Sequence, residues 1–508
     1  MNQKDIIEKI EFLKNFKTET VNIETKSAKI DFPKKCYDTV SSFSNKYGGT
    51  IIFGIDEEND FEISGVYDIN DLQKKMSALC SDTMEPIVRP EFLPIEYDGK
   101  KLVAVEIPEI MQNKKPCYYK SKGIAKGSYT RVGDRDEVMT DYEVYALQSY
   151  KDGIIEDIRP NKRAAMEDLN RESLDMYLKK IKEEKINFAK NTEEKILKLS
   201  GITDNNDDVI YPTLAGTMIF GEYPQAYYPQ LFIACSVIPG TELGDTGSMG
   251  QRFDDNKRVE GTIEEMLEGT LVFLRKNMKT KIIIDSKTGK RENVPEYSME
   301  ALREAIANAL IHRDYSIQTE NAYISVNMYD NRIEIINPGA LYGNNKIEKL
   351  GTTTMMESRN PNIVRILEEK GSVIENRHSG IPTMRREMKK MNLPEPEFIE
   401  ERGTFKVIFR NSFKLTNEQV TGQVSEQVSE QVTGQDENTI VRYKKQILEF
   451  CVDAKSAKEI REFLKLSSRN YVNDNIIKPL LNDGLLEYTN KKSVNASNQK
   501  YLTRNKTN

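Results

Sequence analysis

The segment 417–435, NEQVTGQVSEQVSEQVTGQ, divides the chain, because a polar repeat of this kind has too few apolar residues to form a core. Valine recurs at every fourth position, and a glutamine precedes each valine. On a helix this repeat advances by about 40° per unit, so the valines would form a slanted stripe that could join two copies of the chain. We favour the other interpretation, a tether over 416–436, and keep a homo-oligomer as the alternative.

The two parts differ in charge. The chain of 508 residues has a formal net charge of -6, but residues 441–508 hold 14 Lys and Arg against 7 Asp and Glu. This C-terminal part therefore carries +7 and the rest of the chain carries -13. The acidic total hides a basic segment, so it does not argue against a nucleic-acid partner.

Several classes of protein are disfavoured by composition. The 5 Cys include no Cys-x-x-Cys pair and the chain has 2 His, which argues against a disulfide framework, a cysteine zinc site and His-cluster chemistry. No apolar run approaches the roughly 18 residues that cross a bilayer. The first residues, MNQKDIIEKIEFLKNF, lack the apolar region of a signal peptide. We therefore expect a cytoplasmic protein with no membrane partner.

Residues 1–150 alternate between helical and strand patterns, with helices expected at 4–15 and 33–46 and strands at 20–26, 50–55 and 101–107. Glu19 and Glu24 flank the first strand, Lys26 lies on the same face as Glu24, and Asp56 follows the apolar strand 50–55. Carboxylates that meet at one sheet edge can hold Mg²⁺ or Mn²⁺, which activate water without any His. The alternative is a surface ion pair and a turn residue.

A second feature of this region is the stretch 111–133, MQNKKPCYYKSKGIAKGSYTRVG, which has six basic residues, no acidic residue and interleaved tyrosines. Such a stretch can follow a phosphate backbone and stack on bases, or it can be a lysine-protected edge strand. The candidate nucleic-acid contacts here are Lys114, Lys115, Tyr118, Lys120, Lys122, Lys126 and Arg131.

Over about 15–145 the sequence resembles the Schlafen-type AlbA domain family. The resemblance rests on ETVNIETKSAK, on VSSFSNKYGGTIIFGIDEENDFEISGV and on the Arg-x-Gly of KGSYTRVGDRDEVMT. In Schlafen nucleases two glutamates and a strand-end aspartate form a metal-binding site that cleaves RNA. The resemblance implies that role for Glu19, Glu24 and Asp56, with Lys26 beside them. Many bacterial relatives with these acids are known only as DNA-binding regulators, which keeps a non-catalytic role open.

Residues 151–205 read as a helical connector, and 206–415 as a second α/β region. Here Glu304 and Asn308 share one face of a helix, and Asn337, Gly339, Ser379 and Gly380 lie in turns able to present N–H groups to phosphates. Their order resembles the GHKL ATPase fold, which implies an ATP site in which Asn308 is linked to magnesium. The sequence has Asn337 where that family usually has an adenine-binding Asp, and a lid reduced to one glycine, so hydrolysis is the less expected outcome.

Residues 437–508 have three helical patterns followed by two strands, as in a winged helix-turn-helix. The alternative is a winged helix that pairs proteins. The candidate DNA contacts are Arg469, Asn470, Asn473, Lys478, Lys491 and Lys492.

The sequence thus predicts an α/β (α+β) multidomain chain with a Schlafen-like AlbA domain over 1–150, a GHKL-like α/β sandwich and a winged helix. Two functions fit this order of domains. One is a metal-dependent endoribonuclease, acting on tRNA or other RNA under the control of a nucleotide sensor, as in bacterial anti-phage defence. The other is a non-catalytic, DNA-binding transcriptional regulator with an ATP-binding-like sensor.

Overall fold

The chain forms two compact units, Met1–Val420 and Thr421–Asn508. The structure is a computed structural model, and its described residues are 2–206, 209–284, 291–352, 356–371, 373, 380–411, 447, 450–451, 453–463, 477, 480–481, 485–489 and 500–503. The tether expected over 416–436 lies outside them. The described part is a mixed α+β, multidomain structure, as the sequence predicts. None of its helices is long and apolar enough to cross a membrane.

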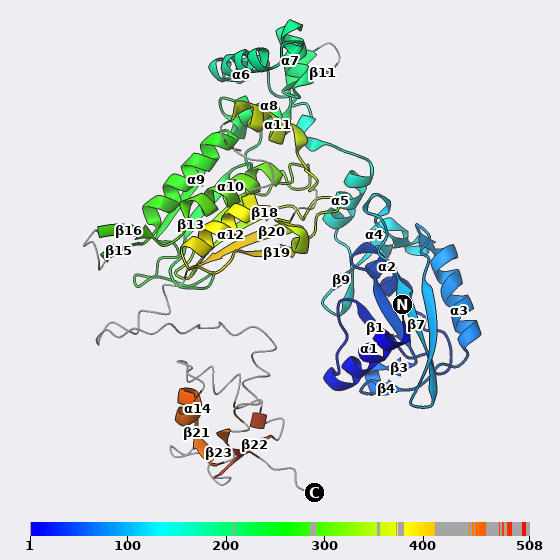
Figure 1. Cartoon of the computed structure of the whole chain (residues 1–508). Coiled ribbons are helices and arrows are strands. Elements are labelled where there is room, and N and C mark those ends of the chain that lie inside the picture. The colour runs from blue at the N-terminus through cyan, green and yellow to red at the C-terminus, as the bar shows by residue number, and fades with distance from the viewer. Residues whose placement is uncertain are drawn as a thin grey trace. The chain divides into compact units, whose positions relative to one another are not determined.

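The first region of the larger unit is built on a four-stranded sheet in the order β1-β2-β7-β6 (Figure 1). Strand β1 is parallel to β2, whereas β2, β7 and β6 pair antiparallel. The strands span β1 Ile23–Lys26, β2 Gly49–Phe53, β6 Glu91–Tyr97 and β7 Lys100–Ile107.

Alternation along β2 and β7 supplies two apolar layers, one on each face of this sheet. Ile52 points to the layer that contains the buried face of α1 (Gln3–Phe16). Ile51 and Phe53 point to the opposite layer, which contains the buried residues of α2 (Tyr37–Asn45) and α3 (Ile69–Ala78). The β1 side chains on the α2 side of the sheet, Glu24 and Lys26, therefore point into the interior of the domain.

The rest of this region consists of short elements. They are β3 Ile55–Asp56, β4 Glu62–Ile63, β5 Met84–Glu85, β8 Tyr118–Tyr119, α4 Gly123–Gly127, β9 Tyr129–Val132, β10 Arg135–Val138 and α5 Asp141–Lys151. The basic stretch 111–133 is thus broken into turns, one helical turn and parts of two β-pairs, β5–β8 and β9–β10. A capping box between Thr140 and Glu143 starts α5.

The second region has a six-stranded sheet in the order β14-β13-β17-β18-β20-β19 (Figure 1). Helices α9, α10 and α12 pack over one face of this sheet. The strands span β13 Ile233–Val237, β14 Asp255–Val259, β17 Ile324–Met328, β18 Arg332–Pro338, β19 Glu397–Glu401 and β20 Thr404–Arg410. The helices span α9 Ile263–Asn277, α10 Met299–His312 and α12 Gly380–Lys390. A separate hairpin joins β15 Thr280–Ile284 to β16 Arg291–Pro295.

The helical residues expected as a connector belong to the core of this second region. Buried residues between 169 and 202 share one apolar cluster with the sheet and with α10. The elements involved are α6 Arg171–Glu184, α7 Glu193–Leu199, β11 Thr203–Asn206, β12 Val209–Pro212, α8 Leu214–Phe220 and α11 Pro361–Lys370.

The described residues of the smaller unit include a three-stranded sheet, β21-β23-β22, and the helix α14. Buried Ile447, Ile460 and Leu480 belong to one small apolar cluster. The elements span β21 Lys455–Ser456, α14 Ala457–Phe463, β22 Leu486–Tyr488 and β23 Lys500–Thr503.

Candidate functional site

The two glutamates expected to be catalytic lie together inside the first region. Glu24 is opposite Ile51 in the parallel register of β1 and β2, so its side chain points to the α2 layer, as does that of Lys26 two residues on. Glu19 precedes the strand and its Oε1 accepts hydrogen bonds from the Thr25 backbone N–H at 2.6 Å and the Thr25 hydroxyl at 2.8 Å. Glu19 and Glu24 are 7% and 5% exposed.

Arg131 contacts both of these glutamates. Its guanidinium is 2.7 Å from Glu24 Oε2 and 3.5 Å from Glu19 Oε2. The Glu24 contact is an ion pair and not an aligned hydrogen bond. Arg131 also donates to Asp136 Oδ1 at 3.0 Å, and Lys26 pairs with Glu24 from the other side. The site is therefore a buried charge cluster of Glu19, Glu24, Lys26, Arg131 and Asp136, which we call the Arg131 cluster.

The pKa values of the two glutamates are shifted in opposite directions. Desolvation, together with a hydrogen bond to Glu24, raises the pKa of Glu19 from 4.5 to about 8. Desolvation also opposes the ionised form of Glu24, but the Glu19 hydrogen bond and the charges of Lys26 and Arg131 outweigh it and lower the pKa of Glu24. At neutral pH Glu19 is therefore protonated, and two carboxylates face two cations.

Asp56 does not join this cluster. Its Oδ2 accepts a hydrogen bond from Asn59 at 2.7 Å, within the turn after β3. Among the described residues, no group of three or more His, Cys, Asp or Glu is placed to hold a metal ion. The donor set in this arrangement therefore does not fit Mg²⁺ or Mn²⁺, because Arg131 and Lys26 already supply the positive charge that a cation would bring.

Asp136 is the member of the cluster that sequence reasoning missed. It faces Arg131 across the β9–β10 hairpin and accepts hydrogen bonds from Thr39 and Ser42 on α2. The signal was present, since the Gly-Asp turn at 133–134 in RVGDRDEV predicts a hairpin that pairs these two residues.

The basic stretch separates into buried and exposed members. Two predicted nucleic-acid contacts are buried: Arg131 lies in the charge cluster, and Lys115 pairs with Glu109 at 2.8 Å. Neither is free to meet a phosphate, which corrects the sequence-based expectation for both residues. The exposed predicted contacts are Lys114, Lys120, Lys122 and Lys126, and Tyr118 is half-buried.

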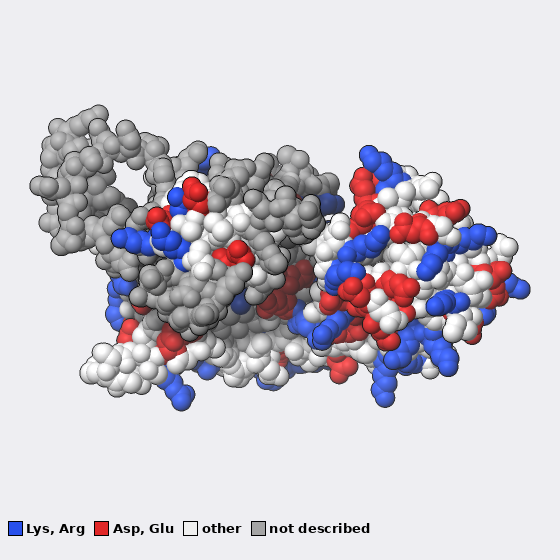
Figure 2. Space-filling model, turned by 90° about the horizontal axis from the view of Figure 1, so that it is seen from below, with Lys and Arg blue, Asp and Glu red and all other residues white. Residues whose placement is uncertain are grey.

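Two of the exposed lysines are already oriented by neighbours. Lys122 Nζ donates to Tyr129 Oη at 2.8 Å and lies 4.7 Å from the centre of the Tyr37 ring. Lys120 donates to the Asp82 carbonyl at 3.1 Å and is 3.7 Å from Glu85. On the face that Figure 2 shows, Lys and Arg alternate with Asp and Glu instead of forming one large basic patch.

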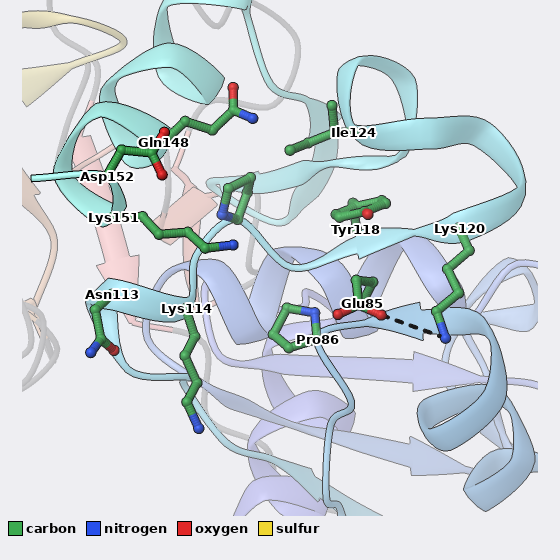
Figure 3. Close-up of a pocket in the computed structure, with 11 residues that line it drawn as sticks. Glu85, Pro86, Asn113, Lys114, Tyr118, Lys120, Ile124, Gln148, Lys151 and Asp152 are labelled. Atoms are coloured by element: carbon green, nitrogen blue, oxygen red, sulfur yellow. Dashed lines mark ion pairs between the residues drawn. The ribbon is translucent and has the colours of Figure 1, made fainter. Parts of the chain in front are cut away.

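A cavity of about 590 Å³ opens beside these lysines (Figure 3). It lies between β5, β8 and the C-terminal end of α5, and all its lining residues belong to the first region of the larger unit. The lining residues are Glu85, Pro86, Asn113, Lys114, Pro116, Tyr118, Lys120, Ile124, Gln148, Lys151 and Asp152.

Three of the expected nucleotide-binding residues meet in the second region. Glu304 and Asn308 lie one turn apart on α10, and Gly380 starts α12 beside them. A Cβ at Gly380 would be 3.0 Å from both Asn308 Nδ2 and Glu304 Oε2, so the start of α12 packs closely against these two side chains. Ser379 lies outside the described residues.

The turn with Asn337 and Gly339 lies against Asp314, just after the C-terminal end of α10. Gly339 has a φ of +114°, and a Cβ there would be 2.7 Å from Asp314 Cβ, so glycine is required by the close approach. Asn337 is 7% exposed and its Oδ1 has no hydrogen-bond partner within the described structure. Asp314 itself accepts hydrogen bonds from Tyr142 at 2.7 Å and Arg359 at 2.8 Å.

The predicted DNA contacts of the smaller unit cannot be placed. All six lie outside the described residues: Arg469, Asn470, Asn473, Lys478, Lys491 and Lys492.

The Arg131 cluster predicts a specific dependence of stability on pH. Between about pH 4.5 and about pH 8 the folded chain keeps the Glu19 proton that the unfolded chain has lost. The free energy of unfolding should therefore fall as pH rises through this window, by about 1.4 kcal/mol for each unit of pKa difference. Glu19→Gln should remove this fall. In thermal unfolding, the stability of the variant relative to that of the wild type should therefore increase as pH rises toward 8.

Glu24→Gln is the matched control, because the Glu24 pKa is lowered. Ionised Glu24 contributes stability above its ordinary pKa, and that contribution is lost as pH falls. This variant should therefore be destabilised at neutral pH, because it removes the carboxylate that pairs with Lys26 and with Arg131. Parallel pH curves for wild type and Glu19→Gln would show that Glu19 is not protonated in the folded chain.

Comparison with known proteins assigns the two regions of the larger unit. Residues 19–140 match the family model described as "Schlafen, AlbA_2", and residues 321–409 match the one described as "Putative ATP-dependent DNA helicase recG C-terminal". No match was found among curated proteins.

Two solved structures were also matched. The DIP2311 protein of Corynebacterium diphtheriae is 17% identical with a TM-score of 0.37, over 95% of this chain and 92% of that one. The N-terminal domain of a putative ATP-dependent DNA helicase RecG-related protein of Nitrosomonas europaea is 28% identical with a TM-score of 0.22, over 26% of this chain and 93% of that one. The two family matches confirm both resemblances: the chain carries a Schlafen AlbA_2 domain near its N-terminus and an ATPase-like domain of the recG C-terminal type in its middle region.

Proposed function

We propose that this chain binds nucleic acid through its Schlafen AlbA_2 domain and that the ATPase-like domain regulates this binding. The observation that carries the proposal is the segment 111–133, in which Lys114, Lys120, Lys122 and Lys126 are exposed and no acidic residue intervenes. Exposed lysines that are held by neighbouring aromatic rings lose less conformational freedom when they meet phosphates. The names of the matched family and of the Nitrosomonas structure refer to helicases, which act on nucleic acid.

A salt titration tests this proposal. Affinity for labelled RNA and DNA should fall steeply with salt, and each lysine that neutralises a phosphate should contribute about 0.7–0.9 to the log–log slope. The double variant Lys122→Ala/Lys126→Ala should therefore lower the slope by roughly 1.4–1.8 if both lysines contact phosphates. Fluorescence anisotropy at several salt concentrations measures the affinity.

The matched control is Lys4→Ala/Lys74→Ala, which removes two exposed lysines of the same domain outside the segment. Equal slopes in both double variants would show that the segment is not the contact surface. No binding of any RNA or DNA at low salt would contradict the proposal as a whole.

Endoribonuclease activity is the second candidate, favoured by the state of Glu19. A carboxyl group with a pKa of about 8 is suited to donate a proton at neutral pH, and it lies beside ionised Glu24 and the cation Lys26. The resemblance to Schlafen nucleases implies a metal ion, whereas Glu24 is paired with Arg131 and Lys26 in the observed cluster. Both versions of the candidate require Glu19 and Glu24, but only the metal version requires Asp56.

Cleavage of labelled tRNA, other RNA and DNA with Mn²⁺, Mg²⁺ or a chelator separates these versions. Glu19→Gln should lower the cleavage rate by 100-fold or more if Glu19 is a general acid, since such groups contribute roughly 10²–10⁴-fold. Asp56→Asn should abolish metal-dependent cleavage if Asp56 is a ligand, and should have no effect if the Arg131 cluster acts by itself. Cleavage that persists in Glu19→Gln/Glu24→Gln would come from another site or a contaminant.

Nucleotide binding by the second domain is supported by the meeting of Glu304, Asn308 and Gly380. A bound nucleotide stabilises the folded state, by about 2.7 kcal/mol when its concentration is 100 times Kd. ATP with Mg²⁺ should therefore raise the thermal unfolding temperature of the wild type and not that of Asn308→Ala. The control Asn321→Ala, an exposed asparagine of the same domain, should keep the shift. An equal shift in all three proteins would place the nucleotide elsewhere.

A further inference from the structure

The cavity beside the basic stretch combines three kinds of group that recognise one nucleotide. Tyr118 offers an aromatic ring, and Pro86, Pro116 and Ile124 supply apolar wall. Asn113, Gln148 and Asp152 are polar side chains at its edge, and Lys114 and Lys151 bring positive charge. Aromatic rings stack on bases, amides and carboxylates bond to base edges, and lysines neutralise phosphate.

Tyr118 faces the cavity, whereas its neighbour Tyr119 faces Tyr37 on α2. Tyr118 and Tyr119 are successive residues of β8, so their rings point to opposite sides. Tyr119 stacks on Tyr37 with ring centres 4.3 Å apart, which leaves Tyr118 to line the cavity. Figure 3 shows Lys151 from α5 and Tyr118 from β8 on opposite sides of the open space.

The lysines of the cavity are available for an anionic ligand. Lys120 is held by Glu85 at 3.7 Å, an exposed pair of the kind that contributes little. Lys114 and Lys151 are exposed, and within the described chain neither ammonium has an ion-pair partner. The volume of about 590 Å³ is within the roughly 300–1,000 Å³ of small-ligand sites.

We propose that this cavity receives one unstacked base, with its phosphate, of a single-stranded nucleic acid. The inference rests on the proposed nucleic-acid binding and adds that the protein selects single strands. Bases of a duplex are stacked and paired inside it, whereas a base of a single strand is withdrawn at the least energetic cost. Single-stranded RNA and DNA share this chemistry, so the two are separate arms of the test.

The experiment compares the full chain with variants, using oligonucleotides of RNA and DNA that contain the fluorescent base 2-aminopurine, as single strands and as duplexes. The wild type should bind single strands more tightly and should quench the probe base by stacking on Tyr118. Tyr118→Ala should lower single-strand affinity by roughly 5- to 150-fold, remove the quenching and leave duplex affinity unchanged. Tyr118→Phe should keep both properties.

Tyr47→Ala is the matched control, because Tyr47 is an exposed tyrosine of the same domain that does not line the cavity. Lys151→Ala offers a second variant at the exposed end of α5, and should weaken single-strand binding even if Tyr118→Ala fails to fold. A preference for RNA over DNA, or the reverse, with quenching retained would identify the strand and support the site.

Three outcomes would overturn the inference. Equal affinity for single strands and duplexes, with equal losses in Tyr118→Ala and Tyr47→Ala, would leave nucleic-acid binding intact and refute base capture. Displacement of the oligonucleotide by an equal concentration of a free mononucleotide would make the cavity a small-ligand site. Absence of binding to every oligonucleotide would refute the proposed function itself, and this inference with it.

Discussion

The buried guanidinium of Arg131 is the interaction on which the first domain depends. It is 1% exposed and meets three carboxyl groups that arrive from different segments: Glu19 before β1, Glu24 on β1 and Asp136 on β10. A planar guanidinium can serve several carboxylates at once, which an ammonium cannot do as well. Removing one partner from such a group leaves an uncompensated buried charge, so these segments are held to one another by charge and not only by apolar packing.

This arrangement bears on whether the acidic residues that resemble the Schlafen pattern form a metal site. The sequence pattern that resembles the Schlafen acids is complete, yet Glu24 is committed to Arg131 and Lys26, and Asp56 is bonded to Asn59. An acidic pattern therefore specifies which side chains lie near β1, while the local cations decide whether those side chains are free to hold a metal. RNA cleavage and nucleic-acid binding require different charged groups of the same domain. The charges of the Arg131 cluster are paired with one another and stabilise the fold.

Much of the fold was predictable from sequence, because a strong periodicity of apolar residues indicates which face of a helix or strand is buried. The helices expected at 4–15 and 33–46 correspond to α1 and α2, and the strands expected at 50–55 and 101–107 correspond to β2 and β7. The proximity of Glu304 and Asn308 also followed from helix geometry. What could not be predicted is which of the charged residues are buried. Lys115 pairs with Glu109 in a turn that no periodicity indicates, and Arg131 meets Glu19 and Glu24, which lie over 100 residues earlier in the chain.

The basic stretch contains buried and exposed residues: Arg131 and Lys115 are buried in ion pairs, and its other lysines are exposed. Arg131 lies at its buried end, where a fork of donors can satisfy fixed carboxylates, and the exposed positions are lysines, which keep their charge in water. Arg131 could not bind a phosphate without giving up its buried ion pairs with Glu24 and Asp136, at a cost of several kcal/mol. The arginine therefore fixes β9 against α2, and Tyr129 on β9 in turn orients the exposed Lys122. The proposed nucleic-acid surface is thus positioned by the buried charge cluster behind it.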